Sequence, residues 1–184
     1  AILNAQPDEH GITYKPLDAA HAGAVATLES LVMGSDAWSE ALVADELPRA
    51  DRVWWAAYEG EALAGYAGGW IVDGQVQILK VGVDPAMRRR GIARELLAHV
   101  AADARDLGAS TCSLEVRAGN LGAQAFYEAL GFKGIGMRPR YYSDREDAVI
   151  MEGPLPLAAR DVAGMALQVD AARTDAVLTG ESAR

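Results

Sequence analysis

Residues 81 to 94 read Val-Gly-Val-Asp-Pro-Ala-Met-Arg-Arg-Arg-Gly-Ile-Ala-Arg. In this stretch an apolar strand stops at Pro85, which has no N–H for a sheet ladder, and a helix opens after Gly91. The free N–H groups at the start of a helix attract negative charge, and the arginines before Gly91 add to that attraction. The order of strand, proline, basic loop, glycine and helix therefore predicts a site for an anionic ligand. A solvated basic turn would explain the arginines but not this order.

The composition limits the class of protein. The chain has 184 residues, which is enough for one domain with a sizeable core, and a formal net charge of -9. That acidic balance argues against a general nucleic-acid binder, which carries a broad basic surface. Cys112 is the single cysteine, so the sequence excludes a disulfide and a thiolate metal site within the chain. We expect a cytoplasmic protein with no metal, no contact with a membrane and no direct contact with nucleic acid.

The segments before the quoted stretch predict a layer of strands preceded by helices. Residues 53–58, 63–71 and 76–83 are rich in apolar residues and separated by Gly-containing turns, which predicts an antiparallel meander. Residues 12–15 predict a first strand, and Ser39 is placed to cap a short helix. Residues 19–33 predict a helix whose apolar positions are Val25, Leu28, Leu31 and Val32.

The segments after it predict a second alternation of helix and strand. The helix from Gly91 to Gly108 has an apolar stripe of Ile92, Leu96, Val100, Ala104 and Leu107. Residues 110–116 alternate apolar and polar side chains, which is typical of a strand with one buried face. Asn120 is expected to cap a helix that ends at Leu130-Gly131, and residues 133–137 and 148–151 predict a final strand pair.

We expect three parts in the chain. Residues 1–11 are polar and predict a flexible N-terminal segment, and residues 12–156 predict one folded domain. The tail, residues 157–184, is Ala-rich and charged with little apolar patterning, so it is expected to be disordered or a loosely docked helix.

Taken together, these motifs resemble the GNAT family of acetyl-CoA-dependent N-acetyltransferases. The loop Arg88-Arg89-Arg90-Gly91-Ile92-Ala93 is similar to that family's pyrophosphate motif, Gln/Arg-x-x-Gly-x-Gly/Ala. The motifs that resemble the family's RimI branch are Leu114-Glu115-Val116-Arg117, Asn120, Phe126-Tyr127-Glu128, Leu130-Gly131-Phe132, Arg138-Pro139-Arg140-Tyr141-Tyr142 and Arg145-Glu146-Asp147-Ala148. Members of that branch acetylate the N-terminal alanine of a small-subunit ribosomal protein. The resemblance runs from Ile12 to Leu155.

Three features depart from the branch pattern. Lys80 stands where the branch often has a neutral polar residue, Gly119 replaces a common serine, and the tail is longer than usual. These departures bear on the choice of substrate more than on the chemistry.

The resemblance implies a fold and a co-substrate. It implies an α+β protein with an α/β/α GNAT fold, in which a mixed, mostly antiparallel sheet of about seven strands is splayed in the middle and flanked by about four helices. Acetyl-CoA would lie between the splayed strands with its pyrophosphate on the helix N-terminus. The implied cofactor-binding residues are Val81, Gly82, Val83, Arg88, Arg89, Arg90, Gly91, Ile92, Ala93, Arg94, Asn120 and Tyr127.

The resemblance also implies two catalytic residues. Glu115 would act as the base that removes a proton from the acceptor amine through a water molecule, and Tyr127 would protonate the thiolate leaving group. The N–H of Val81 would donate a hydrogen bond to the oxyanion. The residues alone favour a different interpretation, in which Glu115 is an exposed carboxylate on the polar face of its strand and Tyr127 is a packed aromatic beside Phe126.

The acceptor is expected to be the N-terminus of a protein or peptide, which in the RimI branch is ribosomal. The protein that binds it is expected to be a monomer. Trp38, Tyr141 and Tyr142 are the candidate acceptor-binding residues, with ordinary packing as the alternative for each. Two other functions stay open: a GNAT enzyme for a small amine or for lysine side chains, and a non-catalytic module that binds acyl-CoA or a partner. A dinucleotide-binding domain does not fit, because no Gly-x-Gly-x-x-Gly motif follows an early strand.

Overall fold

The computed structural model describes residues 6–157. Its strands are β1 (Ile12–Pro16), β2 (Arg52–Glu59), β3 (Ala62–Val72), β4 (Gln75–Val83), β5 (Thr111–Arg117), β6 (Lys133–Arg138) and β7 (Ala148–Pro154). Its helices are α1 (Ala22–Met33), α2 (Glu40–Glu46), α3 (Ile92–Asp106) and α4 (Leu121–Ala129), with short 3₁₀ turns η1 (Ala19–His21), η2 (Gly34–Asp36) and η3 (Pro85–Met87). The prediction for residues 158–184 lies outside the described residues.

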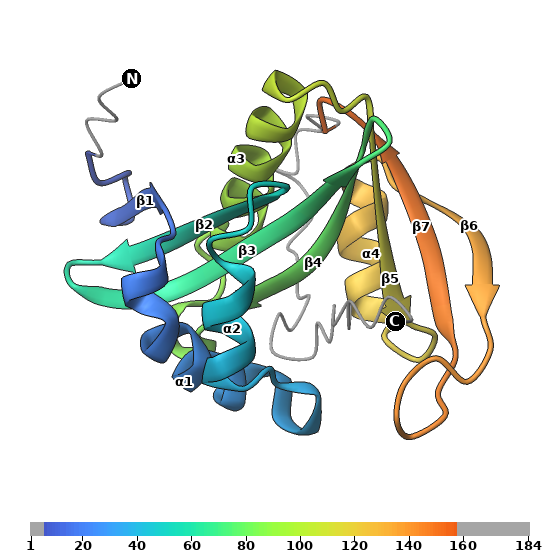
Figure 1. Cartoon of the computed structure of the whole chain (residues 1–184), viewed down its shortest axis with the longest axis horizontal. Helices are drawn as coiled ribbons and strands as arrows, with labels where there is room; N and C mark the ends of the chain where they lie inside the picture. The colour runs from blue at the N-terminus through green and yellow to red at the C-terminus, as the bar shows by residue number, and fades with distance from the viewer. Residues whose placement is uncertain (1–5, 158–184) are drawn as a thin grey trace.

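The strands form one sheet in the order β1-β2-β3-β4-β5-β7-β6. β4 and β5 run parallel, and the other neighbouring strands run antiparallel. Helices α1 and α2 cover one face of the sheet, and α3 and α4 cover the other (Figure 1). The predicted fold class, a mostly antiparallel sheet between helices, is confirmed.

The sheet opens between β4 and β5. The two strands pair only through residues 75–77 and 111–113, although β4 continues to Val83 and β5 to Arg117. Beyond that point they diverge (Figure 1). The expected splay is therefore present, and its edges are the second half of β4 and the residues around Glu115.

A β-bulge in β4 changes which way its side chains point. Gly68 of β3 pairs with Lys80 and the next residue, Gly69, pairs with Ile78, so Leu79 is the extra residue. Ile78 and Val81 consequently pack on the α3 face, whereas Leu79 and Lys80 lie on the α1 face. Without the bulge, strict alternation would have placed Lys80 in the apolar core with Ile78.

Local sequence signals account for most helix boundaries. Ser39 accepts a hydrogen bond from the N–H of Leu42 (3.2 Å) and caps α2, and Asn120 accepts one from the N–H of Ala123 (3.0 Å) and caps α4, as predicted. Two positions assigned to apolar stripes were wrong: Leu31 is 63% exposed and Leu107 is 62% exposed. Leu107 is the C-cap residue that follows the last residue of α3, so the helical spacing of the stripe does not extend to it. Among residues 6–157, no helix is both long enough and apolar enough to cross a membrane.

Candidate active site

The N-terminus of α3 is open. Gly91 occupies the N-cap position with a φ of 69°, which favours glycine, and it has no side chain to cap the helix. The first bond within the helix runs from the N–H of Glu95 to the carbonyl of Gly91 (3.1 Å), so the N–H groups of residues 92–94 have no acceptor inside α3. A Cβ on Gly91 would meet no protein atom within 4 Å. The residues predicted to bind a pyrophosphate thus form a helix end with exposed donors and free space beside it.

The arginines of this loop differ from one another. Arg90 forms an ion pair with Glu59 at the end of β2, which fixes the loop to the sheet edge. Arg89 is exposed and has a φ of 68°, a left-handed conformation that costs free energy for a residue with a side chain. Ile92 is buried in the apolar core. Ile92 can therefore contact a ligand only through its backbone. The side chains of Arg89 and Arg94 are exposed and can turn toward a ligand.

The second half of β4 borders the splay with a buried, largely apolar surface. Val81 and Val83 are 4% and 5% exposed and pack against the α3 face. Gly82 faces α1, where a Cβ would come within 2.6 Å of the Tyr66 ring. Glycine is therefore required at position 82 for packing, in addition to the cofactor contact predicted from the motif.

Glu115 lies on β5 beside the splay and is buried. It is 4% exposed, so the alternative of a solvent-facing carboxylate is wrong. One carboxylate oxygen, Oε1, accepts a hydrogen bond from Nε of Arg138 (2.8 Å), and Oε2 is buried with no hydrogen-bond partner among the described residues. A buried carboxylate oxygen without a donor is unfavourable in a folded protein, which marks this position as a site for another polar group.

Tyr127 lies on the opposite face of the sheet, in α4. Its side chain is fully buried between Phe126 and Phe132, and its hydroxyl has no hydrogen-bond partner among the described residues. Burial raises the pKa of the Tyr127 phenol well above its ordinary value, with smaller contributions from Cys112 and Tyr142. The group therefore stays protonated at physiological pH, which is the state that a proton donor needs.

Tyr142 connects the surroundings of the two predicted catalytic residues. It is 3% exposed, and burial raises the pKa of its phenol, with additional contributions from Glu115 and Asp36. The same ring contributes to the raised pKa of Tyr127. Tyr142 thus lies within reach of the charge of Glu115, and it in turn raises the pKa of Tyr127.

Trp38 and Tyr141 also lie on the α1 face. Trp38 packs edge-to-face on Trp54 with ring centroids 5.9 Å apart, and Tyr141 packs edge-to-face on Tyr142 at 5.1 Å. All three predicted acceptor-binding residues therefore belong to the hydrophobic cluster on this face, with Tyr142 buried and the other two partly exposed.

Two clusters of buried charges surround these aromatics. In the first, Nζ of Lys80 lies 3.1 Å from Oε2 of Glu29, and the hydroxyl of Tyr66 donates to Oε1 of the same carboxylate. Lys80 and Glu29 are both fully buried. Burial lowers the pKa of the Lys80 ammonium, and the charge of Glu29 opposes that shift.

The second cluster is centred on Arg117, two residues after Glu115. Its guanidinium pairs with Asp144 (2.9 Å), Glu146 (3.3 Å) and the carboxylate of Asp36, and lies 4.0 Å from the centroid of the Tyr142 ring. Arg117 is 8% exposed, so the prediction of a polar, solvent-facing side for this end of β5 was wrong. Helices α1 and α2 and the loop between β6 and β7 cover that side.

A signal for these clusters was present in the sequence. Glu29 stands four residues after Val25 and three before Val32, so it falls on the apolar stripe of its helix, and Lys80 interrupts an apolar strand. Opposite charges in two buried segments predict an ion pair between them. The bulge at Leu79, which turns Lys80 toward Glu29, has no comparable signal.

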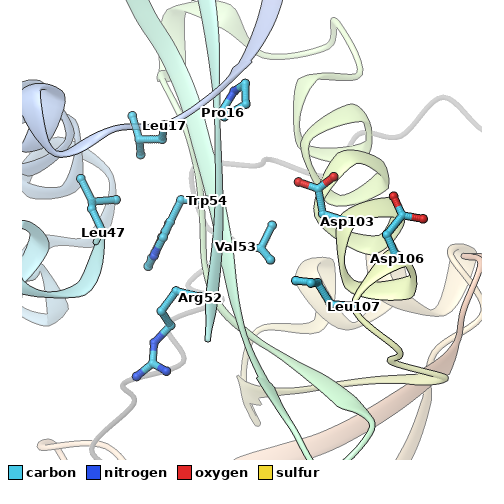
Figure 2. Close-up of a pocket in the computed structure, with 9 residues that line it drawn as sticks. All are labelled: Pro16, Leu17, Leu47, Arg52, Val53, Trp54, Asp103, Asp106 and Leu107. Atoms are coloured by element: carbon cyan, nitrogen blue, oxygen red, sulfur yellow. The ribbon is translucent and has the colours of Figure 1, made fainter. Parts of the chain in front are cut away.

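The pocket drawn in Figure 2 is a different feature. It has a volume of about 430 Å³ and lies where β1 ends, against the first residues of β2. Val53 in the pocket wall pairs with Gly69 of β3, and Gly69 pairs with Ile78 of β4. The pocket therefore lies near the end of the sheet where β4 and β5 are paired, and away from the end where they diverge. Its lining residues are Pro16, Leu17, Leu47, Arg52, Val53, Trp54, Asp103, Asp106 and Leu107. None of them belongs to the site described above.

Comparison with known proteins identifies relatives of this arrangement. The sequence model of the Acetyltransferase (GNAT) family matches residues 24–132. The N-alpha-acetyltransferase RimI of Mycobacterium tuberculosis is 36% identical over 140 residues, which cover 73% of this chain and 87% of that protein. The [ribosomal protein bS18]-alanine N-acetyltransferase of Escherichia coli K12 is 38% identical over 98 residues, 52% of this chain and 66% of that protein. The crystal structure of the Escherichia coli ribosomal-protein-S18-alanine N-acetyltransferase superposes with a TM-score of 0.72 at 31% identity, covering 82% of this chain and 97% of that one.

Proposed function

The chain belongs to the GNAT acetyltransferase family, and we propose that it transfers acetyl from acetyl-CoA to the α-amino group of an N-terminal alanine, on a small-subunit ribosomal protein. The resemblance to the RimI branch is confirmed, and the relatives are N-alpha-acetyltransferases. The Escherichia coli relative, matched both by its sequence and by its crystal structure, carries ribosomal protein S18-alanine in its name, which supports a protein N-terminus as the acceptor here.

The observation that carries the proposal is the buried Glu115 carboxylate with one free oxygen, Oε2, beside the splayed strands. Transfer to an amine needs the unprotonated form of that amine, and an α-amino group has a pKa of about 7.7 to 8.0. At neutral pH a base is therefore useful. A carboxylate with one oxygen held by Arg138 and the other unpaired can accept that proton, directly or through one water molecule.

The residues present fit acetyl-CoA, the acyl donor of GNAT acetyltransferases. The open N-terminus of α3 offers the N–H groups of residues 92–94 and free space beside Gly91, which suits a pyrophosphate. We place Val81, Gly82 and Val83 along the arm of the donor, Arg88, Arg89, Arg90 and Arg94 around its phosphates, and Ala93 and Asn120 beside it. When bound, acetyl-CoA supplies an activated acetyl group with a thiolate as the leaving group.

The remaining chemistry is assigned to this chain's own groups. Tyr127 holds a proton on a buried hydroxyl that has no other acceptor among the described residues, so it can give that proton to the departing sulfur. The N–H of Val81 is assigned to the oxygen that becomes negative during transfer. Trp38, Tyr141 and Tyr142 are assigned to the acceptor because they line the face on which Glu115 lies.

The two alternative functions predict different substrates. A GNAT enzyme for lysine or small amines keeps the same donor site and chemistry but takes a side-chain amine or a free small amine as the acceptor, in place of a protein α-amine. A non-catalytic module would need neither a free Glu115 oxygen nor a protonated Tyr127. The buried, unpaired state of both groups favours an enzyme.

The test is to incubate the full chain with acetyl-CoA and follow acetylation by mass spectrometry. The acceptors are short basic peptides that differ in their first residue, the same peptides with a blocked N-terminus and one lysine, and a polyamine. We expect transfer to the free α-amine of the Ala-first peptide and none to its blocked counterpart. Transfer only to lysine or to the polyamine would overturn the acceptor, and binding of acetyl-CoA with no transfer to any amine would overturn the enzymatic function.

A further inference from the structure

The segment between α1 and α2, residues 34–38, spans the gap between the two splayed strands. On the β4 side, Nζ of Lys80 donates to the carbonyl oxygen of Asp36 (3.2 Å). On the β5 side, the guanidinium of Arg117 pairs with the carboxylate of that same Asp36. One residue of the segment is thus bound to both edges of the splay, although β4 and β5 no longer pair with each other at this level.

The other end of the segment is held by α1. The backbone N–H of Trp38 donates to Oε2 of Glu29 (2.8 Å), and the same oxygen pairs with Lys80. Oε1 of Glu29 is occupied by the hydroxyl of Tyr66 from β3. Glu29 therefore joins α1, β3, β4 and the backbone at Trp38 through a single buried carboxylate.

Lys80 has its position fixed from three directions. Its ammonium group contacts Glu29, the carbonyl of Asp36 and the Trp38 ring, whose centroid is 4.8 Å from Nζ. These contacts match the three donors of an ammonium group, and the side chain is completely buried. The lysine is thus a fixed connection between the bulge of β4 and the 34–38 segment rather than a mobile surface charge.

The segment faces the proposed acceptor. Arg117, which holds Asp36, is on the same strand and the same face as Glu115 and lies against Tyr142. Trp38 is partly exposed at the end of the segment. A shift of residues 34–38 would therefore move the Trp38 ring and the Asp36–Arg117 pair relative to Glu115 without touching the α3 end of the site.

We propose that Lys80 is a positioning residue that fixes the 34–38 segment across the splay, and that the fixed segment determines which first residue of the acceptor peptide is accepted. The inference rests on the proposed function for the identity of the acceptor. It assigns to Lys80 no contact with the acceptor and no proton transfer. Its effect reaches the substrate through the carbonyl of Asp36 and the backbone and ring of Trp38.

The test compares three proteins with the parent. Lys80→Met removes the ammonium group and retains much of the side-chain length. Glu29→Gln with Lys80→Met removes both charges, so no buried charge is left alone, yet Asp36 still lacks its donor. Arg52→Met is the matched control, because Arg52 and Glu46 form a largely buried ion pair (2.7 Å) on the same face but outside the site.

The readouts are KM for the Ala-first peptide, KM for acetyl-CoA, the ratio of rates for Ala-first and Leu-first peptides, and hydrogen exchange of residues 34–38. In both Lys80 variants we expect the peptide KM to rise about 10-fold and the first-residue ratio to fall, with the acetyl-CoA KM within about 2-fold of the parent. Exchange of residues 34–38 should be faster in both. Arg52→Met should change none of the four.

The double variant separates positioning from simple stability. If Lys80 only compensates the charge of Glu29, removing both charges restores the parent's peptide KM and first-residue ratio, and that result would overturn the inference. An unchanged peptide KM and unchanged exchange in Lys80→Met would overturn it as well. Failure of the proposed function would show differently, as absence of peptide acetylation by the parent protein, and the exchange measurement would then decide whether Lys80 fixes the segment.

Discussion

The two faces of the central sheet are built from different kinds of residue. The face covered by α3 and α4 packs apolar side chains from most strands into one cluster that holds no charged residue among those described as buried. The face covered by α1 and α2 holds all the buried charged residues of the described chain, which are Glu29, Glu46, Lys80, Glu115 and Arg117. Figure 1 shows the two helix layers on either side of the sheet.

The two faces contribute differently to stability and to the proposed reaction. Burying apolar surface stabilises a fold at about 25 cal/mol per Å², whereas a buried ion pair is often no more stabilising than apolar residues of the same size. The α1 face therefore carries charges that folding does not require. Four of its five buried charges lie in or beside the proposed acceptor site, and the fifth, Glu46, pairs with Arg52 elsewhere.

Neutralising the buried carboxylate of Glu115 should impair the reaction most. Glu115→Gln should lower kcat at least about 100-fold, because loss of a general base costs about 10²- to 10⁴-fold. Its stability cost should be small, since its partner Arg138 has a side chain that is 55% exposed and can return to solvent. Steady-state rates with the Ala-first peptide measure the first effect, and thermal unfolding measures the second.

Glu46→Gln is the matched control for that variant. It also neutralises a buried carboxylate on the α1 face, but one that contacts Arg52 and Arg49. It should lower stability by about 1 to 3 kcal/mol and leave kcat within about 2-fold of the parent. If Glu115→Gln and Glu46→Gln lose the same amount of kcat, the loss comes from removing any buried charge on this face. Glu115 would then support the stability of the fold and have no specific role in the reaction.

A smaller loss of activity is expected from Tyr127→Phe, and it would show that the apolar α3 face also contributes to the reaction. Tyr127 places one buried hydroxyl in the apolar cluster, and Tyr127→Phe removes only that group. We expect kcat to fall about 100-fold, at the low end of the range of about 10²- to 10⁴-fold for loss of a proton donor, with no loss of stability because no described group bonds to the hydroxyl. Rapid kinetics with acetyl-CoA, together with a thermal melt, measure both quantities.

Tyr14→Phe provides the comparison on the same face. Tyr14 also has a buried hydroxyl without a described partner, and it packs against the same cluster at the sheet edge, on β1. Its removal should leave kcat unchanged. If both phenylalanine variants keep the parent's kcat, Tyr127 has no role as an acid, and neither of these two buried hydroxyls on the α3 face takes part in the reaction.

The sequence predicted the elements well because their signals are local. The turns at Gly60 and Gly74, the caps Ser39 and Asn120, and the Gly91 start of α3 each depend on a few neighbouring residues. The second half of β4 and Glu115 border the splay, and Gly91 is the N-cap of α3. The roles that the family resemblance implies for the motif residues stay predictions.

What the sequence did not predict depends on contacts between distant segments. Alternation along β5 placed Glu115 and Arg117 on a solvent face, but the segment at Asp36 and the loop that carries Asp144 cover them. The bulge at Leu79 reverses the side on which Lys80 lies, and strand periodicity contains no trace of it. Burial of a charge is decided by what packs on top of it, which the strand's own residues do not specify.

The smallest expected effect separates two roles of Asn120, which caps α4 on one side and is assigned to the acyl donor on the other. Asn120→Ala should cost about 1 kcal/mol of stability through loss of the cap, and Asn120→Ser, which retains a capping oxygen, a few tenths. Ser39→Ala removes the cap of α2 and should cost a similar amount with no change in the acetyl-CoA KM. If Asn120 also contacts the donor, both of its variants raise that KM about 3-fold even though Asn120→Ser retains most of the stability that the cap provides. If the acetyl-CoA KM rises in Asn120→Ala alone, the Asn120 side chain acts on the donor only by holding α4 in place. At that position the donor site would then depend on packing, like the apolar face beside it, and not on a polar contact.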